Sequence, residues 1–288
     1  LEEVRSRLSP ESPLYREALA ALALARFGRL DGQGGFSLLG ELAQVENLPG
    51  LGLARLWPWL LCAVAFLGLL VYGESRIEPL RTVEVVEDPL PGPGRLYLFA
   101  LGGLGVALLV SVATGLGLYG NALALFTPYQ QGVVLPLFHL AYGLYLFLGL
   151  YLWQRRRFPG LLGPKEAWVE GFWVGPLLLG LLWAYGQVRG FLGLGGLPPS
   201  LLTFLGLALA APVFRGLVPW VFRERCRDLA LPLAALFFAV AWPGPALFLL
   251  LVGWLLLRLK ERTGGLLGLA LGWVVAGVVM GLFPSAWL

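Results

Sequence analysis

Charged side chains are scarce in this chain of 288 residues. Asp, Glu, Lys and Arg together make up 13% of it, whereas hydrophobic residues make up 58%. Soluble domains of this size carry roughly 25% charged residues and cannot hide so much apolar surface in one core. The composition therefore excludes an ordinary soluble protein and predicts an integral membrane protein, with the excess apolar surface facing lipid.

Histidine and cysteine, two common metal ligands, are almost absent. His139 is the only histidine, and the two cysteines, Cys62 and Cys226, fall in an apolar span and a charged loop. A catalytic metal normally needs three protein ligands, so we expect neither a metal nor a cofactor. We also expect the two cysteines to lie too far apart for a disulfide bond.

The single histidine is a candidate for a polar site within the membrane, because ionisable groups in lipid are costly. The alternative is a hydrogen bond from His139 to a neighbouring helix, through a Tyr or Ser hydroxyl. A Ser-His protease would need a partner such as Ser111, and no nucleophile-elbow pattern surrounds that residue. The structural role is therefore the favoured interpretation of His139.

Long polar stretches are confined to the N-terminal region. In residues 1–55, Ser12 and Pro13 form a helix-start signal, and apolar residues at helical spacing follow over residues 14–30. A second short helix is expected over residues 37–46. We predict amphipathic, peripheral helices here, lying on the membrane surface or forming a small cap, and a transmembrane domain over residues 56–288.

From residue 56 onward, apolar segments alternate with short polar breaks. About 20 apolar residues cross the roughly 30 Å hydrocarbon core of a bilayer. We place spans near residues 56–72, 96–118, 133–153, 168–185, 201–214, 229–242, 246–259 and 266–283. The sequence thus predicts an all-α bundle of about eight transmembrane helices.

The excess of positive charge fits a membrane protein. The net charge is +4, but no basic run is interleaved with aromatics on a polar surface, so we expect no nucleic-acid partner. Most Lys and Arg residues cluster in the breaks after residues 72, 153, 214 and 257. By the positive-inside rule these breaks face the cytoplasm, and we expect a prokaryotic inner or plasma membrane.

Internal repeats are absent, which argues against the inverted-repeat transporters. Glycine, by contrast, is abundant, with 40 residues. Residues 268–272 read Gly-Leu-Ala-Leu-Gly, a small-xxx-small pattern that lets helix backbones touch. We expect this pattern to serve packing inside the bundle, with a dimer face as the alternative.

Three short motifs follow one another in the C-terminal part of the chain. Residues 210–216 read Ala-Ala-Pro-Val-Phe-Arg-Gly, residues 238–242 read Phe-Ala-Val-Ala-Trp, and residues 262–267 read Arg-Thr-Gly-Gly-Leu-Leu. They resemble motifs of the CAAX-protease and bacteriocin-processing family of intramembrane proteases, over residues 200–280. In that family the first motif begins with two glutamates, the second ends in His, and the third precedes a helix carrying His-x-x-x-Asn. The resemblance implies a CAAX-protease-like fold.

The same resemblance implies that the catalytic groups have been replaced. The family uses the two glutamates and two histidines to activate a water for peptide hydrolysis. The matching positions here are Ala210, Ala211, Trp242 and Trp273, and the Asn position is Gly277. Alanine cannot accept a proton, and an indole N–H only donates a hydrogen bond, so neither can act as a general base. We therefore expect no catalytic residue by this mechanism.

Part of the first motif is retained as Phe214, Arg215 and Gly216. We expect Arg215 to reach the cytoplasmic interface or to pair with Glu224 or Asp228. We expect the indoles of Trp242 and Trp273 to fill the space that forms a water-filled catalytic cavity in the family.

A retained framework without its catalytic groups predicts a catalytically silent membrane protein. Its expected role is a scaffold or accessory subunit, or a binder of a lipid or membrane peptide, with membrane lipids and a protein of a membrane complex as partners. One alternative is an active intramembrane endopeptidase that uses other residues, for which His139 is available. Another is a small-molecule transporter, since the short segments 201–214 and 229–242 leave room for a broken-helix site.

Overall fold

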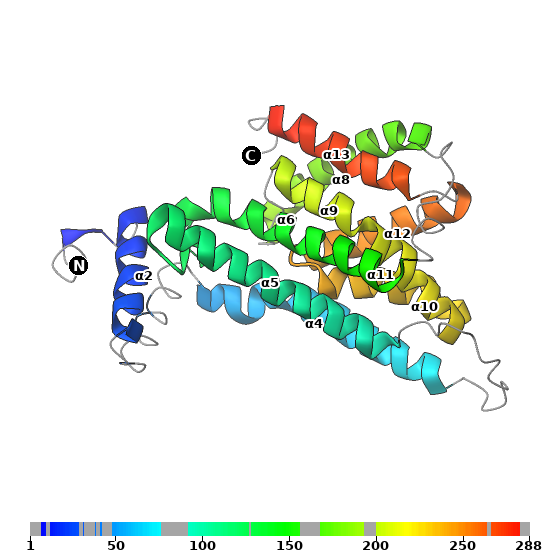
Figure 1. Cartoon of the computed structure of the whole chain (residues 1–288), viewed down its shortest axis with the longest axis horizontal. Coiled ribbons are helices and arrows are strands. Elements are labelled where there is room, and N and C mark those ends of the chain that lie inside the picture. The colour runs from blue at the N-terminus through cyan, green and yellow to red at the C-terminus, as the bar shows by residue number, and fades with distance from the viewer. Residues whose placement is uncertain are drawn as a thin grey trace. The chain divides into compact units, whose positions relative to one another are not determined.

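The computed structural model describes residues 7–9, 12–28, 31, 38, 41, 48–75, 92–126, 128–155, 168–192, 200–263 and 266–282. The elements formed by these residues are all helices (Figure 1), which confirms the all-α prediction. Two parts of the chain lie outside the described residues. They are most of the second predicted N-terminal helix, over residues 37–46, and residues 76–91 in the polar break after residue 72.

Among the described residues, three helices are long and apolar enough to cross a membrane, which is consistent with an integral membrane protein. They cover Pro93–Tyr119, Gly132–Trp153 and Leu201–Glu224. Four shorter apolar helices cover Trp57–Gly73, Trp173–Val188, Ala230–Ala241 and Leu267–Leu282. The count of eight spans therefore stays a prediction.

The chain divides into two compact units. One unit contains Leu1–Trp57 and Ala107–Phe138, and the other contains Pro58–Val106 and His139–Leu288. Two long helices, α5 (Pro93–Tyr119) and α6 (Pro128–Trp153), contribute one part to each unit. The functional division at residue 55 stays a prediction.

The first unit is built around α2 (Pro13–Gly28), which begins at the expected Pro13. Tyr15, Leu19 and Ala20 are buried against Leu8, Leu38 and Leu123. Glu17 accepts a hydrogen bond of 3.1 Å from Gln130, at the start of α6. Helix α2 thus packs into the unit through one face.

The second unit holds the remaining helices. They are α4 (Leu48–Ser75, from residue 58 onward), α8 (Trp168–Leu192), α9 (Leu201–Ala211), α10 (Val218–Arg225), α11 (Ala230–Ala241), α12 (Ala246–Thr263) and α13 (Leu267–Leu282). Helix α13 packs against both α8 and α9 (Figure 1). Gly272 allows the close contact with α8, because a Cβ there would lie 2.5 Å from Cγ1 of Val174. Part of the 268–272 pattern therefore serves internal packing, as expected.

Helices α9 and α10 are joined by a π-helical turn, η3, over Pro212–Leu217. Two prolines explain this irregularity, since Pro212 and Pro219 bring no backbone N–H to the helical ladder. The N–H of Val218 instead bonds to the carbonyl of Val213, five residues earlier. The helix therefore continues to Arg225 rather than ending at Phe214, where the sequence predicted the end of a span.

Helices α11 and α12 form a helical hairpin around a turn at residues 242–245. Helix α11 has 12 residues, so it is roughly 18 Å long and shorter than the roughly 30 Å hydrocarbon core. Its C-terminal end contacts the α6 residues Tyr142 and His139. His139 is about four helical turns, or roughly 21 Å, from the end of α6 at Trp153. Helix α11 is thus shorter than the hydrocarbon core, whereas α12, with 18 residues, is roughly 27 Å long.

Candidate functional site

Arg215 is buried in the π-helical turn, although its side chain is charged. The residue is 2% exposed, and its guanidinium carbon lies 4.7 Å from the centre of the Phe238 ring. Its Nε is fully buried and has no hydrogen-bond partner, and no carboxylate among the described residues forms an ion pair with it. The expectation that Arg215 reaches the interface or pairs with Glu224 or Asp228 is therefore wrong.

The backbone of Arg215 is held by a lysine from α12. In an α-helix the carbonyl of residue 215 would accept from the N–H of residue 219, but Pro219 has none. The Nζ of Lys260 donates to this carbonyl instead, at 2.6 Å. This contact fixes α12 against the π-helical turn.

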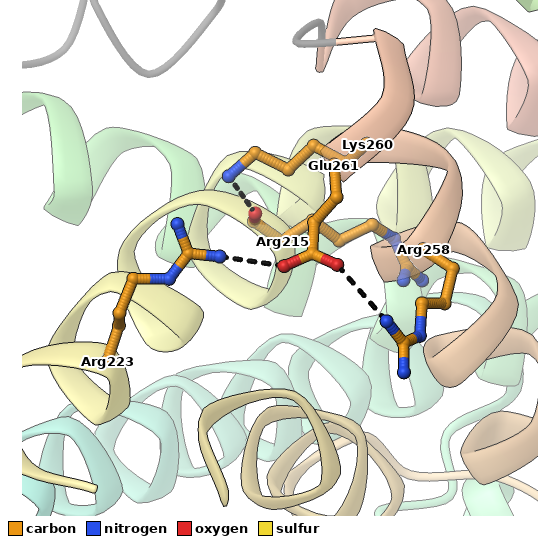
Figure 2. Close-up of polar contacts among 5 residues, drawn as sticks. All are labelled: Arg215, Arg223, Arg258, Lys260 and Glu261. Atoms are coloured by element: carbon orange, nitrogen blue, oxygen red, sulfur yellow. Dashed lines mark hydrogen bonds and ion pairs between the residues drawn. The ribbon is translucent and has the colours of Figure 1, made fainter. Parts of the chain in front are cut away.

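Three more charged side chains lie beside this contact, as Figure 2 shows. Arg223 of α10 bonds to Glu261 at 2.7 Å, and Arg258 lies 3.6 Å from the same carboxylate. We call Arg215, Arg223, Arg258, Lys260 and Glu261 the cationic cluster. It contains four cations and one carboxylate, and the carboxylate contacts the two outer arginines.

Lys260 follows the apolar part of α12 and is partly buried. Burial, together with the nearby positive charge of Arg223, lowers the pKa of Lys260 to about 8, although Glu261 opposes the shift. The ammonium group is thus destabilised in the folded protein relative to water, as expected for a lysine among other cations.

Trp242 lies at the centre of a cluster of rings next to Arg215. It is 1% exposed, and its ring centre lies 5.0 Å from that of Tyr142, 5.7 Å from that of His139 and 6.2 Å from that of Phe214. Phe238, which lies under Arg215, is 6.4 Å away. The indole N–H of Trp242 has no acceptor within the described part of the chain. We call these five rings the aromatic cluster.

The histidine of this cluster has a structural partner. Helix α11 ends with unpaired carbonyls, as all helices do, and three side chains bond near its end. Trp59 donates to the carbonyl of Val240 at 2.9 Å, and Tyr142 donates to that of Ala241 at 2.9 Å. His139 Nε2 lies 2.8 Å from the carbonyl of Pro243. A backbone carbonyl is thus one partner of His139, and the expected bond to a Tyr or Ser hydroxyl stays a prediction.

Ser111 does not take part in this site. Its hydroxyl donates to the carbonyl of Ala107 in its own helix, at 2.9 Å. Cys62 and Cys226 are both buried, and they do not form a disulfide bond. Among the described residues, no group of three His, Cys, Asp or Glu side chains is placed to hold a metal ion.

The other positions of the family motifs are all buried. Ala210 is 1% exposed and Ala211 is 2% exposed, and Gly216 is buried in the π-helical turn. Trp273 is fully buried, lies 5.9 Å from the Phe204 ring between centres, and has no acceptor for its indole N–H. These positions are therefore filled by packed apolar groups.

Gly277, which the resemblance equates with an asparagine, lies against α9. A Cβ at Gly277 would lie 2.6 Å from the Cβ of Phe204, so a larger side chain has no room without a shift of the backbone. The structure thus brings Trp242 and Phe214 into one aromatic cluster beside Arg215, whereas Trp273 and Gly277 both meet Phe204.

Sequence reasoning found Arg215 and Trp242 but missed Lys260 and Tyr142. Pro219 was the available signal for Lys260, because a proline inside a helix leaves a carbonyl that needs another donor. For Tyr142 the signal was its position three residues after His139, on the same face of α6.

Comparisons with known proteins add no relative to this description. No protein-family model, no curated protein and no solved structure matches the chain.

Proposed function

We infer that this protein is a catalytically silent integral membrane protein, with a bundle like that of the CAAX-protease and bacteriocin-processing family, that binds a lipid or a membrane peptide. The observation that carries this inference is the burial of two indoles. Trp242 and Trp273, at the positions of the family histidines, are 1% and 0% exposed. Side chains without a proton acceptor thus fill positions that hold general bases in the family.

Binding, rather than inert packing, is supported by donors that lack acceptors. The indole N–H groups of Trp242 and Trp273, the Oγ1 of Thr203 and the Nε of Arg215 are buried without a hydrogen-bond partner among the described residues. Buried donors of this kind are rare and costly unless another group satisfies them. A ligand with acceptor oxygens would supply such a group.

A role for His139 as an alternative catalytic base has less support. Its Nε2 is engaged with the carbonyl of Pro243, and the ring packs on Trp242. Ser111 bonds within its own helix. These contacts favour His139 as a support for the end of α11.

The experiment that tests the proposal is an assay for peptide cleavage. The full chain is reconstituted in liposomes with prenylated and signal-like peptides, and the products are followed by mass spectrometry. We expect no cleavage above that in empty liposomes. Sustained cleavage by the wild-type protein would contradict the proposal. If that cleavage survived Arg215→Ala and chelators, the resemblance to the family would fall as well.

A further inference from the structure

Arg215 is a buried cation that has no counter-ion among the residues that the structure describes. The residue is 2% exposed, and no carboxylate among the described residues forms an ion pair with it. Its guanidinium lies over the Phe238 ring at 4.7 Å, and its Nε has no hydrogen-bond partner. A cation–π contact offsets a small part of the free energy of burying a charge. A buried charge without a partner is costly, so an anion bound at Arg215 would stabilise the folded protein.

The neighbours of Arg215 increase the positive charge instead of neutralising it. Lys260 Nζ is held 2.6 Å from the Arg215 carbonyl. Arg223 and Arg258 both lie beside Glu261, at 2.7 and 3.6 Å. Their side chains are 58% and 56% exposed, so the cationic cluster extends from the buried Arg215 to the surface. Figure 2 shows Arg223 and Arg258 directed at this carboxylate, whereas Lys260 is directed at the Arg215 carbonyl.

We propose that the cationic cluster binds a phosphate group, with the guanidinium of Arg215 as the main donor. A guanidinium offers five N–H donors in a plane that matches phosphate in a two-point contact, and Lys260 adds a further charge. A phosphate carries more negative charge than a carboxylate, and Glu261 contacts only Arg223 and Arg258, so a phosphate would better balance the remaining positive charge. Irregular π-helical turns such as the one holding Arg215 often occur at functional sites.

This inference rests on the proposed function, because it names the charged end of the bound molecule. The phosphate belongs either to a phospholipid headgroup or to a free phosphate ion. Phe238 lies directly beneath the guanidinium, followed by the aromatic cluster around Trp242. The rings of Phe238 and Trp242 are both buried, so the surroundings of the guanidinium are apolar, and the test below distinguishes the two sources of the phosphate.

The test measures the thermal unfolding of the purified full chain in a neutral detergent. Dioleoyl phosphatidic acid is compared with dioleoylglycerol, which lacks the phosphate, and sodium phosphate is compared with sodium chloride at the same ionic strength. We expect a rise in unfolding temperature with phosphatidic acid beyond that with dioleoylglycerol. If sodium phosphate acts as well, the site recognises the free ion; if it does not, the site recognises the lipid. No rise in either comparison overturns the inference.

Two sets of variants locate the effect. Arg215→Gln is expected to weaken the binding by about tenfold or more, since hydrogen bonds to charged groups are the strong ones. Arg155→Gln removes an exposed cation at the end of α6 and is expected to leave the binding unchanged. Equal binding in Arg215→Gln and the wild type would overturn the inference.

A second variant tests the same site if Arg215→Gln does not fold. Arg223 and Arg258 are exposed, so the double variant Arg223→Gln and Arg258→Gln should fold. It is expected to bind several-fold more weakly and with less dependence on salt. Unchanged binding in this variant would also overturn the inference. Peptide cleavage is a separate readout, so phosphate binding by a protease would refute the proposed function while leaving this site in place.

Discussion

Lys260 and Arg215 are joined by a hydrogen bond that substitutes for a missing backbone contact. The Nζ of Lys260 lies 2.6 Å from the Arg215 carbonyl, whose partner in a regular helix would belong to Pro219. The lysine thus meets the requirement that a buried carbonyl be paired. It also holds α12 next to the turn that positions the guanidinium.

This relationship predicts a coupling between Lys260 and Pro219. Lys260→Met leaves the Arg215 carbonyl without its donor and should lower the free energy of unfolding by about 1 kcal/mol. Pro219→Ala restores a backbone N–H, so the cost of Lys260→Met should become smaller in that background. A double-mutant cycle in detergent, followed by far-UV circular dichroism, measures the difference. Arg262→Met, at an exposed position on the same helix end, is the control. Equal costs in both backgrounds would contradict the assigned role of Lys260.

The lowered pKa of Lys260 predicts a dependence of stability on pH. The folded protein releases this proton near pH 8, whereas the unfolded chain keeps it up to about 10.5. Between these values the unfolded state binds more protons, so stability should rise with pH. Below pH 8 the full cost of the charged group is present.

The measurement for this effect is the unfolding temperature between pH 7 and 10. We expect the wild type to gain stability relative to Lys260→Met as the pH rises through about 8. The lysine is partly exposed, so solvent screening reduces the size of the gain. Parallel curves for the two proteins would show that Lys260 titrates normally.

The two buried indoles predict large effects of truncation. Trp242→Ala and Trp273→Ala should each lower the free energy of unfolding by about 3–5 kcal/mol, as truncation of a large buried aromatic usually does. Trp173 is 78% exposed, so Trp173→Ala should change stability by about 0.5 kcal/mol or less. Equal effects at all three positions in chemical denaturation would show that Trp242 and Trp273 do not fill the bundle.

Gly277 and Gly281, both on α13, provide a test and a control for the packing of this helix. A Cβ at Gly277 would lie 2.6 Å from the Phe204 Cβ, whereas a Cβ at Gly281 meets nothing within 4 Å. Gly277→Ala should therefore destabilise the protein by about 1–3 kcal/mol through overpacking. Gly281→Ala should be neutral or stabilise by up to about 1 kcal/mol, because alanine favours the helix. The free energies of unfolding of both variants test this prediction. If Gly277→Ala left the free energy of unfolding unchanged, α9 and α13 would be less closely packed than described.

Much of the helical structure could be predicted from the apolar segments alone. The predicted segment 246–259 lies within α12 (Ala246–Thr263), and 266–283 almost coincides with α13 (Leu267–Leu282). The end of the segment that starts at Leu201 was wrong, because the π-helical turn absorbs Pro212 without ending the helix. Proline marks a lost hydrogen bond, and the surroundings decide whether the helix stops there.

The site was predictable in its residues but not in its contacts. The sequence singled out Arg215 and Trp242, but not the burial of the arginine. Lys260, which bonds to Arg215, is 45 residues away along the chain, and no local pattern links the two. His139 was expected to bond to a neighbouring helix, yet its partner Pro243 lies in a turn 104 residues away. Such contacts depend on tertiary packing, which hydrophobic periodicity does not encode.

The most direct test of binding in place of hydrolysis is native mass spectrometry of the full chain, extracted gently from its membrane. The account predicts a protein that carries a bound amphiphile, and an added prenylated peptide that keeps its full mass after incubation. Arg215→Gln should retain less of the bound molecule. A bare protein that shortens the added peptide would contradict the account.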